Sequence, residues 1–202
     1  NSRHASAESL MTDPVATPAP DTREIILTAS DIAVQFGGLR AVDGVSLDVR
    51  RGEIVGVIGP NGAGKTTFFQ VLSGFVRPTA GEVRFRGERI DGLAPELICR
   101  RGLTRTFQIV EVFPSPTVRE TLTAAALVRM ALAEARKCAV ATARLVRHKD
   151  KLALTCRQLP LPAQKALENG KAVATTPAMI LLDAVMAGLH PAQAHQVVAL
   201  IR

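Results

Sequence analysis

Residues 59–66 read Gly-Pro-Asn-Gly-Ala-Gly-Lys-Thr and satisfy the pattern GxxxxGK(S/T). Glycines at these positions let backbone N–H groups turn inward around phosphate oxygens, in conformations that side chains would block. The lysine of such a loop reaches the β- and γ-phosphates of a nucleotide, and the hydroxyl that follows it ligates Mg²⁺. These eight residues therefore predict a nucleoside triphosphate site.

A loop of this kind must join a buried strand to a helix. Ile54 to Ile58 is a short, nearly continuous apolar run, which predicts a strand buried on both faces. Residues 66–76 space their large apolar side chains as a helix does, with Phe69, Leu72, Phe75 and Val76. We expect this helix to begin at Lys65 and to direct the positive end of its dipole at the phosphate.

The second half of such a site is an acidic residue at the end of a neighbouring parallel strand. Residues 179–182 are all apolar and predict a buried strand, and Asp183 follows them directly. Asp183 then lies at the crevice where Mg²⁺ and its waters are held. An aspartate after an apolar run is by itself more often a helix cap or a turn residue, so this role depends on the phosphate loop.

The remaining elements alternate between short strands and helices. Short strands are predicted over residues 25–27, 32–34, 45–49 and 103–107, and Val83 and Phe85 alternate with arginines as in a strand with one solvated face. The pair Gly37-Gly38 predicts a turn.

Helices are predicted over three further stretches. Residues 117–145 are rich in Ala and Leu and predict one helix, for which Thr117 and Glu120 supply a capping box. Other helices are expected over residues 163–174 and from about Pro191.

Composition limits the class of protein. The chain has 202 residues, of which 47% are hydrophobic and 21% charged. This suits one α/β domain, or one domain with an inserted lobe, and excludes a wholly disordered chain. No apolar run approaches the roughly 20 residues that cross a bilayer, so we expect no membrane span. Three cysteines without CxxC spacing and four histidines without a ligand pattern predict neither disulfides nor zinc.

The positive charge is concentrated in one segment. The formal net charge is +7, and residues 136–171 contain nine Lys and Arg but only two acids. A solvated helical face is one interpretation of this segment, and a docking surface for a partner is the other. The segment offers no aromatic ring to stack on bases, so we expect no nucleic-acid partner.

Further motifs resemble those of the ATP-binding subunits of ABC transporters, over about residues 24–202. GPNGAGKTT matches that family's phosphate loop, residues 105–108 with 112–114 resemble its Q-loop, residues 34–38 its A-loop and residues 187–191 the D-loop that faces a partner subunit. The resemblance implies ATP contacts from Phe36, Gly59, Pro60, Asn61, Gly62, Ala63, Gly64, Lys65, Thr66, Thr67 and Gln108. It implies Mg²⁺ contacts from Thr66, Gln108 and Asp183, and catalytic roles for Lys65 and Gln108.

The same resemblance implies an α/β fold, a P-loop NTPase core with an antiparallel β subdomain and an inserted α-helical subdomain. The ATP-binding domain is expected over residues 23–202, truncated at its C-terminus, with the helical subdomain at about 109–172. Residues 1–22 are small, polar and proline-punctuated and predict a disordered leader. Met11 is a candidate natural start, which makes residues 1–10 candidate non-native sequence.

Within this family, the combination of FGGLRAV, RTFQ and MAGLHP is most similar to subunits of branched-chain amino acid importers, and related urea and amide importers share much of it. The resemblance implies a dimer, identical or mixed, that holds ATP between its two subunits. Membrane-spanning permease subunits would then couple ATP binding and hydrolysis to import. A cytoplasmic protein, peripheral on the inner face of the cell membrane, is expected.

Three departures from the family pattern favour an alternative, a subunit that binds nucleotide but is deficient in hydrolysis. Residues 159–165 read LPLPAQK where the signature LSGGQ is expected, and prolines cannot donate a backbone N–H. Ala184 occupies the position of the glutamate that polarises the attacking water. The chain also ends before the switch histidine, for which His195 lies too early. A soluble ABC protein acting on nucleic acid or ribosomes would carry two cassettes, whereas this sequence has one phosphate loop.

Overall fold

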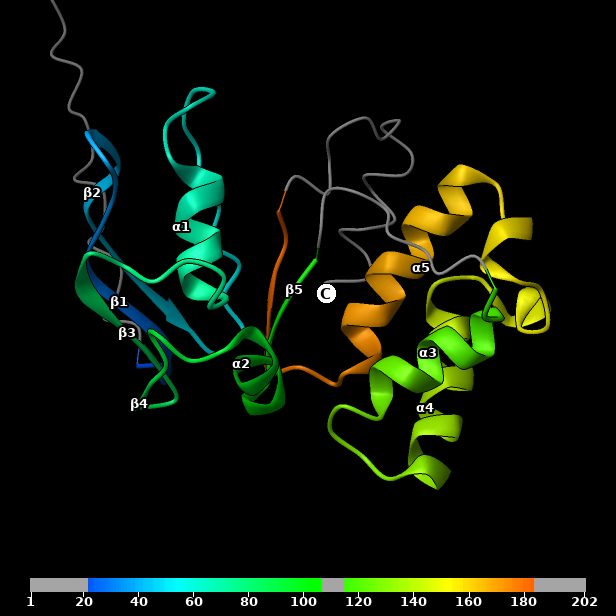
Figure 1. The fold of residues 1–202 in the computed structure, drawn as a ribbon. Coiled ribbons are helices and arrows are strands. Elements are labelled where there is room, and N and C mark those ends of the chain that lie inside the picture. Colours follow the sequence, from blue (N-terminus) through cyan, green and yellow to red (C-terminus); the bar gives the residue numbers. More distant parts are fainter. Residues whose placement is uncertain (1–21, 107–114, 184–202) are drawn as a thin grey trace, which may run out of the picture.

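The computed structural model describes residues 22–106 and 115–183. Figure 1 shows an antiparallel sheet with helix α1 at one end, a central pair of strands, and a group of helices at the other end. The phosphate loop belongs to the part with the sheet. No helix within the described ranges is long and apolar enough to cross a membrane.

The antiparallel sheet has the order β2-β1-β3-β4. Its strands are β1 (Ile25–Phe36), β2 (Leu39–Arg50), β3 (Ala80–Phe85) and β4 (Glu88–Arg89). Val83 and Phe85 are buried and Arg84 between them is exposed, which confirms the alternation expected in β3. The turn between β1 and β2 falls at Gly37-Gly38, also as expected.

The structure joins the short strands expected at the N-terminus into one long hairpin. β1 and β2 have twelve residues each. Their pairing shifts register at several points, for example between Ala29 and Ile32. Such irregularities break the alternation of buried and exposed residues, so the sequence of one long strand reads as two short ones.

A first hydrophobic core lies between the sheet, two helices and the central strands. Helix α1 (Lys65–Leu72) contributes Phe68, Val71 and Leu72, and α2 (Pro95–Arg101) contributes Ile98. The start of α1 at Lys65 confirms the expectation, but the helix ends at Leu72, and Phe75 is exposed. The expectation over residues 66–76 was therefore wrong in its C-terminal part. We did not predict α2, although its proline in the first turn and Gly102 at its end are typical helix boundaries.

The central strands β5 (Leu103–Arg105) and β6 (Met179–Leu181) pair in parallel. Arg105 lies opposite Leu181 in the register, and the N–H of Thr106 donates to the carbonyl of Leu181 at 3.0 Å. Two segments more than 70 residues apart in the sequence therefore lie side by side. Asp183 comes two residues after the end of β6.

Residues 54–58 contradict the expectation of a buried strand. They form no strand, and the exposed fractions of Ile54 and Ile58 are 67% and 96%. A parallel strand is buried only when neighbours pair along its edges and helices cover its faces. β5 and β6 pair with each other, and no strand of the described residues pairs with residues 54–58. This apolar run therefore remains at the surface.

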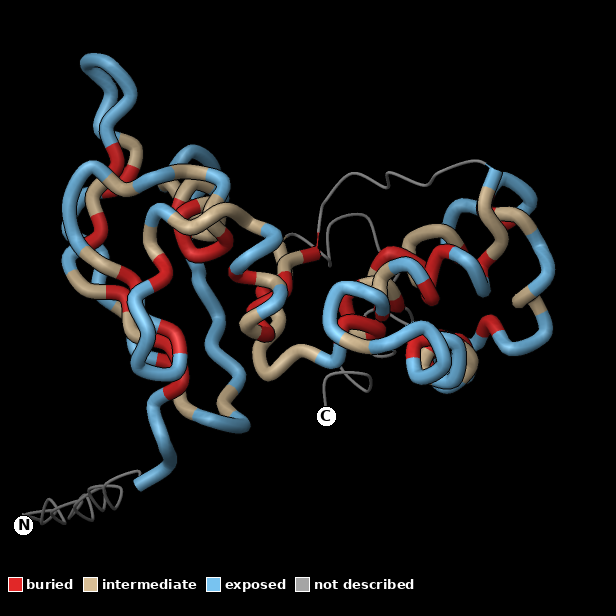
Figure 2. Tube along the Cα trace, turned by 60° about the horizontal axis from the view of Figure 1, so that its bottom comes forward, coloured by how far each residue is buried: buried red, intermediate tan, exposed pale blue. Residues whose placement is uncertain are grey.

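The helices α3 (Val118–Ala126), α4 (Leu132–Leu145) and α5 (Leu161–Ala174) form the helical group. Two short 3₁₀ turns, Lys149–Lys151 and Cys156–Gln158, connect α4 to α5. The second hydrophobic core lies among these helices and is built largely from Ala and Leu. Figure 2 shows buried positions both around the sheet and among the helices.

The expected single helix over residues 117–145 is wrong, because the chain breaks between α3 and α4. Thr117 does cap α3, with its hydroxyl accepting from the Glu120 N–H at 3.2 Å and the Glu120 carboxylate accepting from the Thr117 N–H at 2.8 Å. The break escapes a reading of the sequence because Ala and Leu continue through it without Gly or Pro. Packing of α3 against α4 buries an alanine face of α4 against Val118, Leu122 and Ala126 of α3.

The buried side chain of His148 joins α4 to α5. Its Nδ1 lies 2.6 Å from the carbonyl oxygen of Val146 at the end of α4. Its Nε2 lies 2.8 Å from the carbonyl oxygen of Ala163 in the first turn of α5. The imidazole thereby fixes the N-terminus of α5 against the end of α4.

Substitution of Leu167 tests the second hydrophobic core. It is fully buried on α5, so Leu167→Ala should lower the free energy of unfolding by about 2–5 kcal/mol in urea denaturation. Leu161 on the same helix is 59% exposed, and Leu161→Ala is the matched control, with an expected change within about 0.5 kcal/mol. Equal effects of the two substitutions would contradict a core among these helices.

Candidate nucleotide-binding site

The phosphate loop forms a tight turn that leads into α1. Gly62 and Gly64 adopt left-handed conformations, with φ of 82° and 83°. The N–H of Ala63 donates to the carbonyl of Pro60 at 3.3 Å and closes the turn. Gly64 is the N-cap of α1, and its carbonyl accepts the N–H of Phe68 at 2.8 Å.

Gly64 also lies against β2 of the sheet. A Cβ on Gly64 would lie 2.1 Å from the carbonyl oxygen of Ala41 and 3.3 Å from the Val42 side chain. A Cβ on Gly62, by contrast, would meet nothing within 4 Å. The two glycines are thus required for different reasons: Gly62 for its backbone conformation, and Gly64 also for the close approach of the loop to the sheet.

The N-terminus of α1 suits an anion. The N-cap Gly64 offers no side chain to its first N–H groups, and the first turn holds no acidic residue. The Nζ of Lys65 donates to the carbonyls of Gly59 and Pro60 at 2.6 and 2.7 Å, so the ammonium lies over the loop. Free N–H groups, the helix dipole and a cation therefore converge on one small region, and this donor set fits a phosphate.

The other residues expected at the nucleotide lie around this loop or on the neighbouring hairpin. Asn61 and Thr66 are exposed and Thr67 is half-buried. Phe36 ends β1 with 51% of its surface exposed. Two residues before it, Val34 pairs with Val42 of β2, the residue next to the contact with Gly64. The hairpin that contacts the start of α1 therefore carries an exposed aromatic ring at the end of β1.

Asp183 forms an ion pair with Arg105 on the neighbouring strand. The Nη2 of Arg105 lies 2.7 Å from Oδ2 of Asp183, and the two side chains are 7% and 13% exposed. Nη1 of Arg105 donates to the hydroxyl of Ser73 at 3.3 Å, and the guanidinium lies 5.8 Å from the ring centroid of Phe75. Sequence reasoning missed this role of Arg105, although a charged residue in a short apolar strand signals a buried partner of opposite charge.

The residues present include oxygens of the kind that a nucleotide-bound magnesium ion takes. Magnesium in nucleotide sites takes one or two protein oxygens together with phosphate oxygens and water. The hydroxyl of Thr66 and Oδ1 of Asp183 are oxygens of this kind, and Oδ1 accepts no hydrogen bond from any described group. Within residues 22–106 and 115–183, no three His, Cys, Asp or Glu side chains cluster as an ion's full ligand set.

Several expected site residues lie outside the described ranges. These are Gln108 of the Q-loop resemblance, Ala184, residues 187–191 of the D-loop resemblance, and His195. The predicted leader, residues 1–22, lies outside as well except for its last residue.

The segment in place of the signature motif starts α5. Pro160 is the N-cap of this helix, Pro162 lies in its first turn, and no side chain caps it. The side-chain amide of Gln164 points back toward the residues before α5 and donates to the carbonyl of Leu159 at 2.9 Å. The expectation that α5 begins near Ala163 is correct to within one turn, since the helix begins at Leu161.

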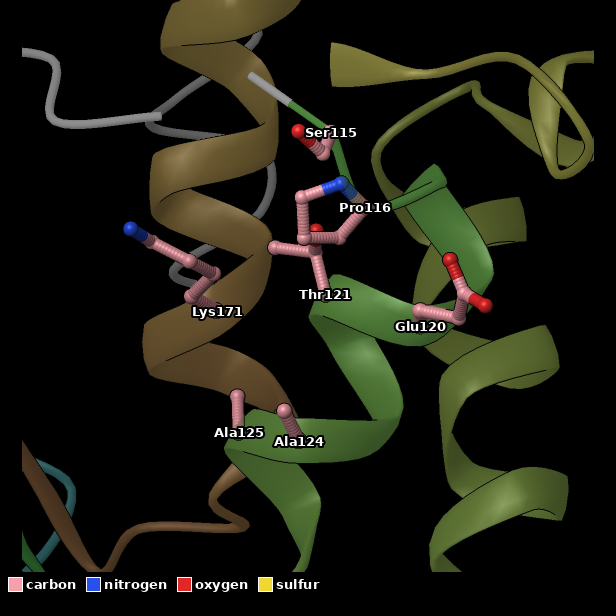
Figure 3. A pocket seen from close by; sticks show the side chains of 7 residues that line it. All are labelled: Ser115, Pro116, Glu120, Thr121, Ala124, Ala125 and Lys171. Carbon is pink, nitrogen blue, oxygen red and sulfur yellow. The ribbon is translucent and has the colours of Figure 1, made fainter. Parts of the chain in front are cut away.

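A hollow of about 620 Å³ lies between α3 and α5, and Figure 3 shows its lining. Alanines and the aliphatic parts of polar residues make up most of its surface: Ser115, Pro116, Glu120, Thr121, Ala124, Ala125 and Lys171. α3 and α5 lie on the other side of β5 and β6 from α1, so this hollow is separate from the phosphate loop (Figure 1).

Comparison with known proteins matches residues 42–187 to the family model described as ABC transporter. The high-affinity branched-chain amino acid transport ATP-binding protein BraF of Pseudomonas aeruginosa is 36% identical over 192 residues, covering 87% of this chain and 75% of BraF. The corresponding protein LivG of Escherichia coli K12 is 35% identical over 195 residues, with the same coverage of 87% and 75%.

Solved structures agree with the sequence relatives. An ATP-binding cassette of an ABC transporter in its ADP conformation superposes with a TM-score of 0.77 at 28% identity, over 88% of this chain and 75% of that one. A nucleotide-free cassette gives a TM-score of 0.75 at the same 28% identity, over 86% and 74%. The antiparallel sheet, the phosphate loop with α1 and the inserted helices therefore form the fold expected from the sequence. The chain belongs to the ABC transporter family, as one of its ATP-binding cassettes.

Proposed function

We propose that this chain binds Mg·ATP and, as part of a dimer, couples ATP binding and hydrolysis to the import of branched-chain amino acids through a membrane permease. The nucleotide part rests on one observation: the loop of residues 59–64 presents the uncapped N-terminus of α1 and the Lys65 ammonium to the same point. The transport part rests on the 36% identity with BraF, whose name states that activity.

The backbone N–H groups of Gly62 and of residues 64–66 would hold the phosphates. Lys65 exchanges its two loop carbonyls for the β- and γ-phosphate oxygens and stabilises the charge that develops in hydrolysis. Thr66, Asp183 and Gln108 would hold Mg²⁺, which neutralises phosphate charge when it is bound, and Gln108 would orient the attacking water. Phe36 would stack on adenine, which its exposed ring at the end of β1 supports.

Charge on the helical group supports a docked partner. Of the nine basic residues within 136–171, only Lys171 forms an ion pair with a described acid, Glu168 at 2.5 Å. Arginines of the antiparallel sheet are neutralised instead, such as Arg84 by Glu82 and Arg89 by Asp91. We propose that this positive surface faces the permease and the lipid surface on the inner side of the cell membrane.

A subunit that binds nucleotide without hydrolysing it is the second candidate function. Two prolines at the start of α5 remove N–H donors where the family's signature loop contacts the partner's γ-phosphate, and no hydroxyl replaces its serine. Ala184 removes the general base as well. In this case the chain would work beside an intact subunit.

Lys65→Ala tests the nucleotide site. Removing a charged hydrogen-bond donor costs about 1.5–3 kcal/mol, so ATP should bind roughly tenfold or more weakly in titrations with a fluorescent ATP analogue. Lys149→Ala removes an exposed lysine from the helical group and serves as the control, with an affinity equal to that of the unaltered chain. Equal affinities for all three proteins would refute the site.

The two left-handed glycines of the loop should respond differently to alanine. Gly62→Ala meets open space, so its cost to folding is the left-handed conformation alone, about 1–2 kcal/mol. Gly64→Ala would also drive a methyl group into the Ala41 carbonyl and should lower the free energy of unfolding by more. Urea denaturation of both variants measures the difference. A larger loss for Gly62→Ala would contradict the described packing of the loop.

Ala184→Glu tests, for the second candidate function, which departure from the family pattern causes the deficiency in hydrolysis. If the missing general base is the main defect, this substitution should raise phosphate release from Mg·ATP by about 10²-fold or more. Ala184→Gln is the control, because an amide cannot take up the proton of the attacking water. Release that stays unchanged in Ala184→Glu would assign the defect to the prolines at the start of α5.

A further inference from the structure

The ion pair between Arg105 and Asp183 is buried, unlike most ion pairs between the residues that the structure describes. Its two side chains are 7% and 13% exposed, whereas those of Arg40 and Asp43 are 62% and 66% exposed. An exposed pair of that kind is screened by water and contributes little. A buried pair holds its partners firmly, because each would otherwise be left as an uncompensated charge.

The same guanidinium reaches the helix that follows the phosphate loop. Nη1 of Arg105 donates to the hydroxyl of Ser73, the C-cap of α1, at 3.3 Å. That hydroxyl donates in turn to the carbonyl of Phe69 at 2.6 Å, inside the last turn of α1. A cation is favourable at this end of a helix, where the dipole is negative. Arg105 therefore connects the far end of α1 to the carboxylate that follows β6.

The two carboxylate oxygens of Asp183 differ in their hydrogen bonding. Oδ2 accepts from Nη2 of Arg105 at 2.7 Å, and Oδ1 accepts from none of the described groups. A carboxylate held by one oxygen in this way cannot rotate freely, so its second oxygen has a fixed direction. In metal sites, loss of a group that orients a ligand from behind typically lowers metal affinity by about 10- to 100-fold.

We propose that Arg105 is a positioning residue for nucleotide-bound Mg²⁺. It fixes the Asp183 carboxylate and leaves Oδ1 for the metal and its waters. It also holds that carboxylate at a fixed position relative to α1. This inference rests on the proposed function, since it assigns Asp183 to the Mg²⁺ of Mg·ATP.

The role depends on the guanidinium group of arginine, and another cationic side chain would fill it only in part. The planar guanidinium uses two different nitrogens, Nη1 toward Ser73 and Nη2 toward Asp183. A lysine ammonium at the end of a single stem reaches one of these partners at a time. Arg105→Lys should therefore retain part of the effect, and Arg105→Met should lose it while keeping an aliphatic stem beside Phe75.

The test compares ATP affinity in excess Mg²⁺ with ATP affinity in EDTA, using the full chain and a fluorescent ATP analogue. The ratio of the two affinities is the Mg²⁺ enhancement. We expect Arg105→Met to reduce this enhancement by about 10-fold or more and Arg105→Lys by less. Affinity in EDTA should stay within about twofold, because the phosphate-loop donors are untouched. Arg101→Met is the control, since Arg101 pairs with the exposed Glu88, and it should change neither affinity.

A second comparison distinguishes positioning from a general loss of structure. Asp183→Asn should reduce the enhancement by itself, and adding Arg105→Met to it should reduce the enhancement no further. Independent effects of the two substitutions, or an unchanged or increased enhancement in Arg105→Met, would overturn the proposal. If circular dichroism shows that Arg105→Met does not fold, the enhancement in Arg105→Lys decides, and a value equal to that of the unaltered chain overturns it. An unaltered chain that binds no ATP in either condition would overturn the proposed function itself.

Discussion

The close approach of Gly64 to β2 is the constraint on which the site depends. The carbonyl of Ala41 occupies the space where a Cβ of residue 64 would lie, so the loop touches the sheet backbone to backbone. This contact fixes where α1 begins, and the left-handed turn at Gly64 fixes how the chain enters the helix. The N–H groups at the start of α1 are left free toward the loop, which is what an anion site requires.

The other end of α1 is held by charge. Ser73 caps the helix and accepts a hydrogen bond from Arg105, whose second nitrogen is paired with Asp183. The phosphate loop and the acidic residue lie more than 100 positions apart in the sequence. They are connected through one short helix, with a packing contact at its start and a buried cation at its end. Only a few residues therefore determine how the phosphate loop and Asp183 are placed relative to each other.

The helical group is organised on a different basis. Its core is built mainly from alanine and leucine, so its helices approach closely, and His148 ties α4 to the start of α5. Its basic side chains are mostly without ion partners among the described acids, whereas the sheet pairs its arginines with nearby carboxylates. Among the described residues, the cassette thus combines a sheet whose arginines are paired with carboxylates and a helical group whose basic side chains mostly lack acidic partners.

Local signals in the sequence predicted local structure well. The spacing of residues 59–66 predicted the loop and the start of α1, and Thr117 with Glu120 predicted a cap that the structure forms. The prediction failed where the outcome depends on distant partners. An apolar run at residues 54–58 becomes a buried strand only if other strands pair with it, and its composition carries no information about that. The pairing of Arg105 with Asp183 likewise follows from the parallel register of β5 and β6.

Hydrogen–deuterium exchange of the backbone amides tests the central claim most directly, because that claim concerns N–H groups. Exchange of residues 59–67 would be compared with Mg²⁺ alone and with Mg·ATP. The account predicts strong slowing at the amides of Gly62 and of residues 64–66, where phosphate oxygens replace water as acceptors. Slowing that is absent there, while ATP is demonstrably bound, would contradict the assignment of this loop as the nucleotide site.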